Sequence, residues 1–484
     1  MSSKKSILLH TLVYMLGLGA SKGIAVALVP LYTRWLTQSE YAMWDLTTTS
    51  VLFAGAVIDM GMCTTLARLY IGSKEPEERA MATRTAMAVV IAMSMLFIAA
   101  GLAFGEPLAK WLLGDAARGD LIRLASISAA ITVLGNIPLA LLRAKHKSSL
   151  FSALCVIRAL ASLGFIYYFA YVRKWGVEGI LVGDTLGLAV LALAGIATSP
   201  REFVPAFKRD WLVKVLVFGL PLVPIAVATL TTLVSDRYFL KTAVGLEQLA
   251  VYSLGTKVAL LMSLFAQALQ VAWGPAAFSM AETPTARKDL ADSFRLVCLG
   301  LALLALGLSA YAPELVRLFG PPSYREAYRI VPWISLSYAL QSAVIIVSTN
   351  MVIVHRTGLV MLGYLAGAAS KLALNALLIP IYGISGAAAA TLGAYALQIA
   401  IGLWQTRRVY PVPYAHSQLL ALVVATLAAA LLLSLLGPAS TPVTIAIRTA
   451  VLAVFGIGLF MSPYVTTRER QQVINHGRRL LVRS

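Results

Sequence analysis

Apolar runs of about 20 residues recur along the whole chain, and short polar connections separate them. A run of this length can cross a bilayer as a helix. We count 14 runs, with approximate centres at Ala20, Phe53, Met93, Ile131, Ser162, Leu188, Pro224, Leu260, Ala302, Ala343, Ala369, Ala390, Ala425 and Val454. The pattern therefore predicts an all-α integral membrane protein with about 14 transmembrane helices. The first run, from about Ile7 to Tyr32, is too long for a signal-peptide core, so we expect it to be retained.

The chain also contains an internal repeat. Residues 175–180 (WGVEGI) return as residues 382–387 (YGISGA), with both glycines displaced by 207 positions. Residues 34–46 return less closely within 237–254, with offsets of 203 for the Arg and 208 for the Ala and Leu. Duplicated halves in a membrane chain are typical of transporters whose two bundles move about a site between them.

The repeat predicts the domain organisation. We expect an N-lobe of six spans in residues 1–200 and a C-lobe of six spans in residues 201–410. Spans 13 and 14 follow in 411–466 without a partner in the repeat, and a basic tail occupies 467–484.

Composition and charge agree with a membrane protein. The chain is 59% hydrophobic and 13% charged, with a formal net charge of +19. In a soluble protein this charge would suggest a nucleic-acid partner. With both termini placed inside, however, 24 of the 40 Lys and Arg fall in inner segments and 11 in outer loops. This bias predicts cytoplasmic termini and no nucleic-acid partner.

Ionisable residues inside the predicted spans are candidates for a substrate site, because charge within a bilayer is costly and usually functional. The cations are Lys22, Arg158, Lys257 and Lys371, and the anions are Asp59 and Asp184. The excess of cations predicts a positive interior, which attracts an anion such as a diphosphate and repels a cationic drug.

Other roles stay open for these groups. Each cation could instead form a structural ion pair, such as Lys257 with Asp184 or Arg158 with Asp59. Either aspartate could also couple transport to protons. Helix breakers in the first span (Gly17, Gly19, Gly23, Pro30) and the seventh (Gly219, Pro221, Pro224) predict bending helices, although close packing would also use them.

Motifs for catalysis and cofactors do not stand out. The three cysteines lie in apolar runs without metal-ligand spacing, so we expect no metal site. We find no phosphate-binding loop and no hydrolase motif, so we expect neither an enzyme nor a cofactor.

Three connections resemble those of a known family. Residues 34–44, 236–253 and 379–388 are similar to the span 1–2, span 7–8 and span 11–12 connections of bacterial polysaccharide exporters. These are oligosaccharide-lipid flippases of the Wzx type, in the superfamily that also holds lipid II flippases and multidrug extruders of the MATE type. The family usually has Gly where Ala42 and Ala250 stand.

The resemblance implies two six-helix lobes in a V that alternately faces in and out. The implied cargo is an undecaprenyl-diphosphate-linked oligosaccharide, turned from the cytoplasmic to the outer leaflet of the inner membrane for surface polysaccharide synthesis. Implied partners are membrane lipid and the polysaccharide polymerase and chain-length proteins. The alternatives are a lipid II flippase or a cation-coupled extruder on the same fold. A membrane glycosyltransferase would need longer loops, and a passive scaffold would not need charge at mid-depth.

Overall fold

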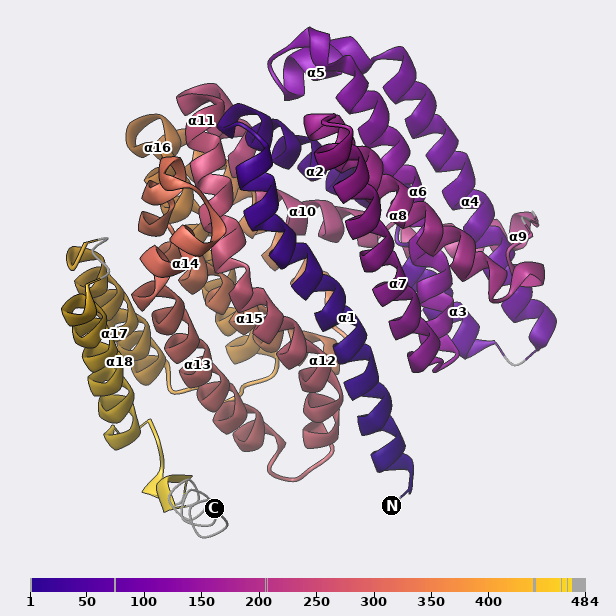
Figure 1. Cartoon of the computed structure of the whole chain (residues 1–484). Helices are drawn as coiled ribbons and strands as arrows, with labels where there is room; N and C mark the ends of the chain where they lie inside the picture. Colours follow the sequence, from indigo (N-terminus) through magenta and orange to yellow (C-terminus); the bar gives the residue numbers. More distant parts are fainter. Residues whose placement is uncertain are drawn as a thin grey trace, which may run out of the picture. The chain divides into compact units, whose positions relative to one another are not determined.

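The chain is helical throughout the part that the structure describes. The computed structural model describes residues 2–73, 75–204, 206, 208–437, 441–462, 464–467 and 469–471, and no strand occurs among them. Figure 1 colours the helices by their position in the sequence, from indigo for α1 to gold for α17 and α18. Helices satisfy every interior backbone hydrogen bond within one segment, which a bilayer requires. The predicted all-α class is confirmed.

The first half of the repeat contains eight α-helices and two short helical turns. These are α1 (Ser2–Trp35), α2 (Gln38–Asp59), α3 (Met62–Gly72), α4 (Pro76–Ala103), α5 (Gly105–Leu112), η1 (Ala116–Arg118), α6 (Gly119–Ala144), α7 (Ser148–Ile166), η2 (Tyr167–Val172) and α8 (Gly176–Ala197). The turn η3 (Pro200–Glu202) follows.

The second half and the two added spans contain ten further α-helices and one turn. These are α9 (Arg209–Gly219), α10 (Leu222–Val234), α11 (Asp236–Ala259), α12 (Leu261–Ala281), α13 (Ala286–Ala310), α14 (Ala312–Phe319), η4 (Pro322–Arg329), α15 (Val331–Ile353), α16 (Thr357–Val409), α17 (His416–Leu435) and α18 (Pro442–Met461).

Two long helical segments each contain two spans. Among the described residues, 11 segments are long and apolar enough to cross a membrane, and two of them have 55 and 53 residues. The backbone leaves the helical region at Gly245 (φ 83°) within α11 and at Gly383 (φ 56°) within α16. Glycine tolerates these left-handed values without a Cβ clash. The chain can reverse at both points. Dividing the two long segments there turns the 11 segments into 13 spans, and α1 adds one more, in agreement with the 14 predicted spans.

The repeat is visible in the backbone as well as in the sequence. Gly176 and Gly383, which are 207 residues apart, have φ values of 59° and 56°. His146 and His355 both adopt left-handed values, 56° and 57°, at the turns before α7 and α16. Histidine is one of the few residues with a side chain that enters this region with some frequency. Short amphipathic helices, α5 and α14, also follow the third and ninth spans.

Spans 2 and 7 are both broken, and their breaks touch. Met60 and Gly61 are left-handed between α2 and α3, and Gly219 and Pro221 interrupt the helix between α9 and α10. A Cβ added to Gly61 would lie 2.6 Å from the carbonyl oxygen of Gly219, so only hydrogen fits there. The break in span 7 was expected. In span 1, by contrast, α1 is one continuous helix with Pro30 inside it.

The chain packs as two compact units. Unit 1 comprises Met1–Ser253 and Tyr364–Ala387, and unit 2 comprises Leu254–Gly363 and Ala388–Ser484. These two units are the parts of the chain that pack most closely within themselves. The predicted division was based instead on the sequence repeat: two lobes at 1–200 and 201–410, followed by added spans at 411–466. That division stays a prediction. Most of the expected basic tail, 467–484, lies outside the described residues.

Candidate functional site

A buried polar cluster lies inside unit 1, where α2, α11 and α16 supply its charged side chains. Its centre is the Asp236 carboxylate, whose side chain is 2% exposed. Lys371 Nζ lies 3.0 Å from Asp236 Oδ2, and Tyr252 Oη donates to the same oxygen at 2.6 Å. Arg237 Nη1 donates to Asp236 Oδ1 at 3.1 Å. Three donors therefore offset the cost of burying this carboxylate.

A second carboxylate completes the cluster. Asp45, on α2, accepts a hydrogen bond of 2.6 Å from Arg237 Nε and one of 2.7 Å from Ser253 Oγ. Arg237 thus bridges two aspartates through different nitrogens, as its planar, fork-shaped guanidinium allows. The side chains of Arg237 and Asp45 are only 7% and 2% exposed, so the pair is desolvated.

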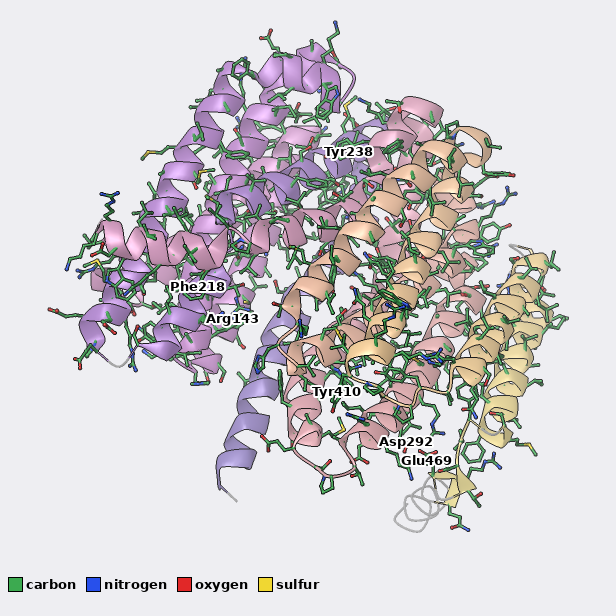
Figure 2. All side chains as sticks on the ribbon, turned by 180° about the vertical axis from the view of Figure 1, so that it is seen from behind. Arg143, Phe218, Tyr238, Asp292, Tyr410 and Glu469 are labelled. Carbon is green, nitrogen blue, oxygen red and sulfur yellow. The ribbon has the colours of Figure 1, made fainter. Side chains whose placement is uncertain are left out.

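The cluster connects the two halves of the repeat within unit 1. Asp45 belongs to the first half, and Asp236, Arg237, Ser253 and Lys371 belong to the second. Nearby, Ser50 on α2 and Tyr238 on α11 share a hydrogen bond of 3.1 Å, and Figure 2 labels Tyr238. Charged hydrogen bonds of this kind hold two surfaces together and can separate when water or a ligand replaces them.

Lys371 was predicted from its position in span 11 to line a cavity. In this structure its side chain is fully buried and its ammonium group contacts Asp236. One turn further along α16, Asn375 Nδ2 donates to Ser235 Oγ at 3.1 Å. Lys371 therefore neutralises an interior acid here, and a contact with cargo would require the cluster to rearrange.

Arg158 and Asp184 form a more accessible pair. Arg158 Nη2 on α7 lies 3.4 Å from Asp184 Oδ1 on α8, and the two side chains are 33% and 37% exposed. Ser162 Oγ donates to the same carboxylate oxygen at 3.0 Å. The suggested pairing of Arg158 with Asp59 does not match this contact, because helix register, which spacing alone does not give, selects the partner. The suggested pairing of Lys257 with Asp184 stays a prediction.

The remaining predicted site residues are Lys22, Lys257 and Asp59. Lys22, on α1, is half-buried, and Lys257, on the part of α11 that belongs to unit 2, is also half-buried. Asp59 Oδ1 accepts a hydrogen bond of 3.3 Å from the backbone N–H of Cys63. Asp59 therefore stabilises the start of α3 at the break in span 2.

The predicted excess of cations is not present in unit 1. Asp45, Asp236 and Arg237 were not among the predicted interior charges, but all three are buried. When these three residues are added to the predicted ones that lie in unit 1, the set contains four cations and four anions: Lys22, Arg158, Arg237, Lys371, Asp45, Asp59, Asp184 and Asp236. The argument from net charge against a cationic cargo therefore fails.

Comparison with known proteins identifies the family. The family described as "Polysaccharide biosynthesis protein" matches residues 31–328 of this chain, which is more than half of its length. This chain belongs to that polysaccharide biosynthesis protein family. A search of curated proteins finds no match to it.

The fold of this polysaccharide biosynthesis protein is similar to several solved transporters. One is the lipid II flippase MurJ in an inward closed conformation, with a TM-score of 0.71, 14% identity, and coverage of 93% of this chain and 97% of that one. A second is a multidrug resistance MATE transporter in an outward-facing conformation, with a TM-score of 0.60, 16% identity, and coverage of 87% and 96%.

A third similar structure is a transporter of the MOP superfamily from Pyrococcus furiosus, described as having a binding pocket of reverse polarity. Its TM-score is 0.57 at 14% identity, covering 83% of this chain and 95% of that one. The polysaccharide biosynthesis protein is therefore a multi-pass membrane protein with the fold of these transporters. No group of three or more potential metal ligands occurs among the described residues.

Proposed function

We propose that the protein is a flippase for an oligosaccharide linked to undecaprenyl diphosphate. It moves this cargo from the cytoplasmic to the outer leaflet of the bacterial inner membrane, with both termini in the cytoplasm, during surface polysaccharide synthesis. The observation that carries the proposal is the family match over residues 31–328, because it connects a transporter fold with polysaccharide synthesis.

The polar cluster supports transport by alternating access. A gate must be stable when closed and must still open, and hydrogen-bonded charges that can regain water meet both needs better than a dry apolar interface. Arg237 joins Asp45 of the first half to Asp236 of the second, with bonds of 2.6 and 3.1 Å. We assign these residues to a gate that closes one side of the transport path.

Two accessible cations support a diphosphate cargo. Lys22 is half-buried and Arg158 is 33% exposed, so both can meet a ligand without a change in the buried cluster. Arg158 offers a planar fork suited to phosphate oxygens, and Lys22 offers a point charge. In this proposal, Arg158 pairs with the Asp184 carboxylate until the diphosphate of the cargo takes the place of that carboxylate. Lys257 stays a proposed cargo contact, and Asp59 and Asp184 stay proposed coupling groups.

A lipid II flippase is the second candidate. The structural similarity to MurJ favours it, but at 14% identity that similarity supports the fold and not the cargo. Both cargoes carry a polyprenyl diphosphate, so the same cations would serve either one. The two candidates differ in the glycan, and a genetic test must therefore measure the two pathways separately.

Complementation distinguishes these functions. In a strain that lacks this gene, wild-type protein is expected to restore export of the surface glycan, and Lys22→Ala and Arg158→Gln are expected to lose most of it at equal membrane abundance. Arg329→Ala is a matched control, because its side chain is 59% exposed and pairs across one helical turn with Glu326 at 3.7 Å. Rescue of a lipid II flippase deficiency without any restoration of glycan export would favour the second candidate.

A further inference from the structure

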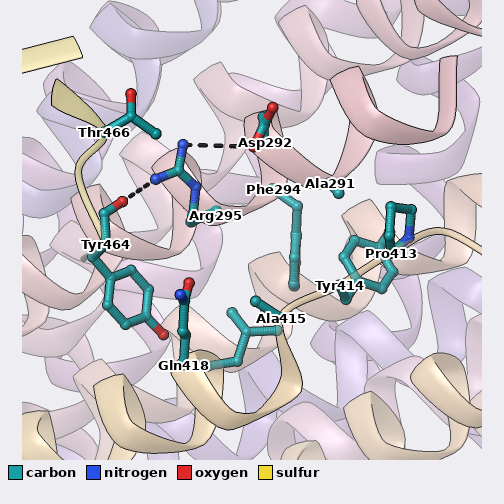
Figure 3. A pocket seen from close by; sticks show the side chains of 11 residues that line it. Ala291, Asp292, Phe294, Arg295, Pro413, Tyr414, Ala415, Gln418, Tyr464 and Thr466 are labelled. Carbon is teal, nitrogen blue, oxygen red and sulfur yellow. Dashed lines mark hydrogen bonds and ion pairs between the residues drawn. The ribbon is translucent and has the colours of Figure 1, made fainter. Parts of the chain in front are cut away.

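Unit 2 contains a polar cavity that the proposed transport does not use. Its volume is about 220 Å³. Residues from the first turns of α13, from the segment before α17 and its first turn, and from the chain after α18 line it, as Figure 3 shows. They are Ala291, Asp292, Phe294, Arg295, Pro413, Tyr414, Ala415, Gln418, Leu419, Tyr464 and Thr466.

The charges of this cavity do not suit a purely anionic ligand. Arg295 Nη2 lies 2.7 Å from Glu469 Oε1 and 3.6 Å from Asp292 Oδ1, and its Nη1 donates to the carbonyl oxygen of Tyr464. One guanidinium thus faces two carboxylates. The Asp292 side chain is 50% exposed, so it can also bind a cation that enters the cavity.

The cavity also offers groups that bind anionic oxygen. The cap residue of α17, Ala415, makes no side-chain cap, and the first turn of this 20-residue helix has no acidic residue. The N–H of His416 donates to the carbonyl oxygen of Tyr414 at 2.9 Å, so the N–H groups of Ser417 and Gln418 are the ones available to a phosphate. The Tyr464 hydroxyl is buried and has no hydrogen-bond partner among the described residues. Burial raises the pKa of Tyr464 to about 12, so the phenol keeps its proton and can donate it.

An apolar cavity of about 350 Å³ adjoins the polar one, because Phe294 and Leu419 line both. Aliphatic side chains from α13, α15, the second part of α16 and α17 form most of its wall. Two of its wall residues, Ala396 and Ala400, are exposed and lie one turn apart on α16. A cavity of this chemistry suits a hydrocarbon chain.

We infer that the two adjoining cavities form a binding site for one phospholipid with a zwitterionic phosphoethanolamine headgroup. The phosphate lies at the start of α17 with the Tyr464 hydroxyl, the ammonium group contacts Asp292, and one acyl chain fills the apolar cavity. Such a headgroup brings its own cation, which Asp292 accepts, whereas an anionic headgroup would meet two carboxylates that share a single guanidinium. The inference does not depend on which cargo the protein transports.

Lipid retention by the purified full-length protein tests this site. The protein is equilibrated with equal amounts of phosphatidylethanolamine and phosphatidylglycerol of matched chains, and the lipids that stay bound are quantified by native mass spectrometry. Wild-type protein is expected to retain phosphatidylethanolamine with several-fold enrichment. Asp292→Asn is expected to reduce this preference to near equality, because it removes the ligand for the amine and leaves the apolar cavity intact.

Filling the apolar cavity supplies the second test. Ala396→Trp combined with Ala400→Trp is expected to reduce retention of both lipids, whereas Leu397→Trp is expected to keep it. Leu397 is on the same helix, is 40% exposed and does not line the cavity. Equal retention of the two lipids by wild-type protein would overturn the inference. Displacement of phosphatidylethanolamine by an equimolar polyprenyl phosphate would also overturn it and would assign the cavities to the cargo.

Discussion

Ser253 Oγ donates a hydrogen bond of 2.7 Å to Asp45 Oδ2, and the two residues, 208 positions apart, hold the same place in the two halves of the repeat. Duplication therefore produced two equivalent positions that now contact each other. One carries a carboxylate and the other a hydroxyl, so they attract, whereas two aspartates at this distance would repel. Arg237 strengthens the contact through its bond of 2.6 Å to the same carboxylate oxygen.

Arg237 is expected to contribute far more to stability than Ser253. Arg237→Ala leaves two buried carboxylates without their shared cation, which costs about 3–5 kcal/mol. Ser253→Ala removes one hydrogen bond, which costs about 1 kcal/mol. Thermal unfolding in detergent, followed with a thiol-reactive dye that reports on Cys63, Cys155 and Cys298, checks this order. Equal losses for the two variants would refute it.

Lys371 and Asp236 are expected to depend on each other. Lys371→Met or Asp236→Asn alone removes the opposite charge from one buried group, at a cost of about 3–5 kcal/mol each. The double variant is expected to lose clearly less stability than the sum of the two single variants, because it contains neither of the two charges. A complete thermal-unfolding cycle with Lys371→Met, Asp236→Asn and both measures the coupling. Additive losses would show that the 3.0 Å contact has no energetic importance.

The contact between the broken helices predicts that substitution of glycine by alanine lowers thermal stability at Gly219 but not at Gly19. Gly219→Ala would place a Cβ against the backbone carbonyl of Met60, which cannot move without disturbing α3, so we expect lower thermal stability and lower yield. Gly19→Ala is the matched control. A Cβ there meets nothing within 4 Å, and alanine favours a helix by about 1 kcal/mol. If both variants unfold at the wild-type temperature, the breaks do not pack as described.

Most of the fold could be predicted from the sequence, because spans and repeats leave direct patterns. Gly176 and Gly383 were matched by sequence, and the structure gives them nearly equal φ values. The break at Met60 and Gly61 could not be predicted, since methionine rarely adopts a left-handed conformation and no proline marks the position. The contact with Gly219 is a tertiary feature without any local signal.

The candidate site was predicted only in part. Lys371 stands out because a lysine inside an apolar run is costly and therefore conspicuous. Asp45, Asp236 and Arg237 do not, because they lie where an apolar run gives way to a polar connection, and charge there is normally solvated. Their burial depends on how α2, α11 and α16 pack together, and so does the choice of Asp184 as the partner of Arg158.

Acidic pH is expected to release the chain that follows α18. Burial acts to raise the pKa of Glu469, but hydrogen bonds from Thr466 and the nearby Arg295 lower it overall. The carboxylate therefore stabilises this segment above its ordinary pKa of 4.5, and that contribution is lost as the pH falls through the lowered value. The protection of residues 464–467 and 469–471 against hydrogen exchange, relative to the intrinsic rate at each pH, is expected to fall in this range in wild-type protein. Glu469→Gln should show low protection at every pH, and a wild-type protection that does not change with pH would contradict this prediction.

The most direct test of the central claim is translocation by purified protein in vesicles. A polyprenyl-diphosphate-linked oligosaccharide is placed in one leaflet, and its appearance in the other is measured with a glycan-modifying enzyme that cannot cross the membrane. We expect wild-type protein to expose the cargo well above the rate of protein-free vesicles, and we expect Lys22→Ala and Arg158→Gln to lose at least about tenfold, equivalent to 1.4 kcal/mol. If wild-type vesicles match protein-free vesicles for this cargo while they translocate lipid II, the protein is not an oligosaccharide-lipid flippase.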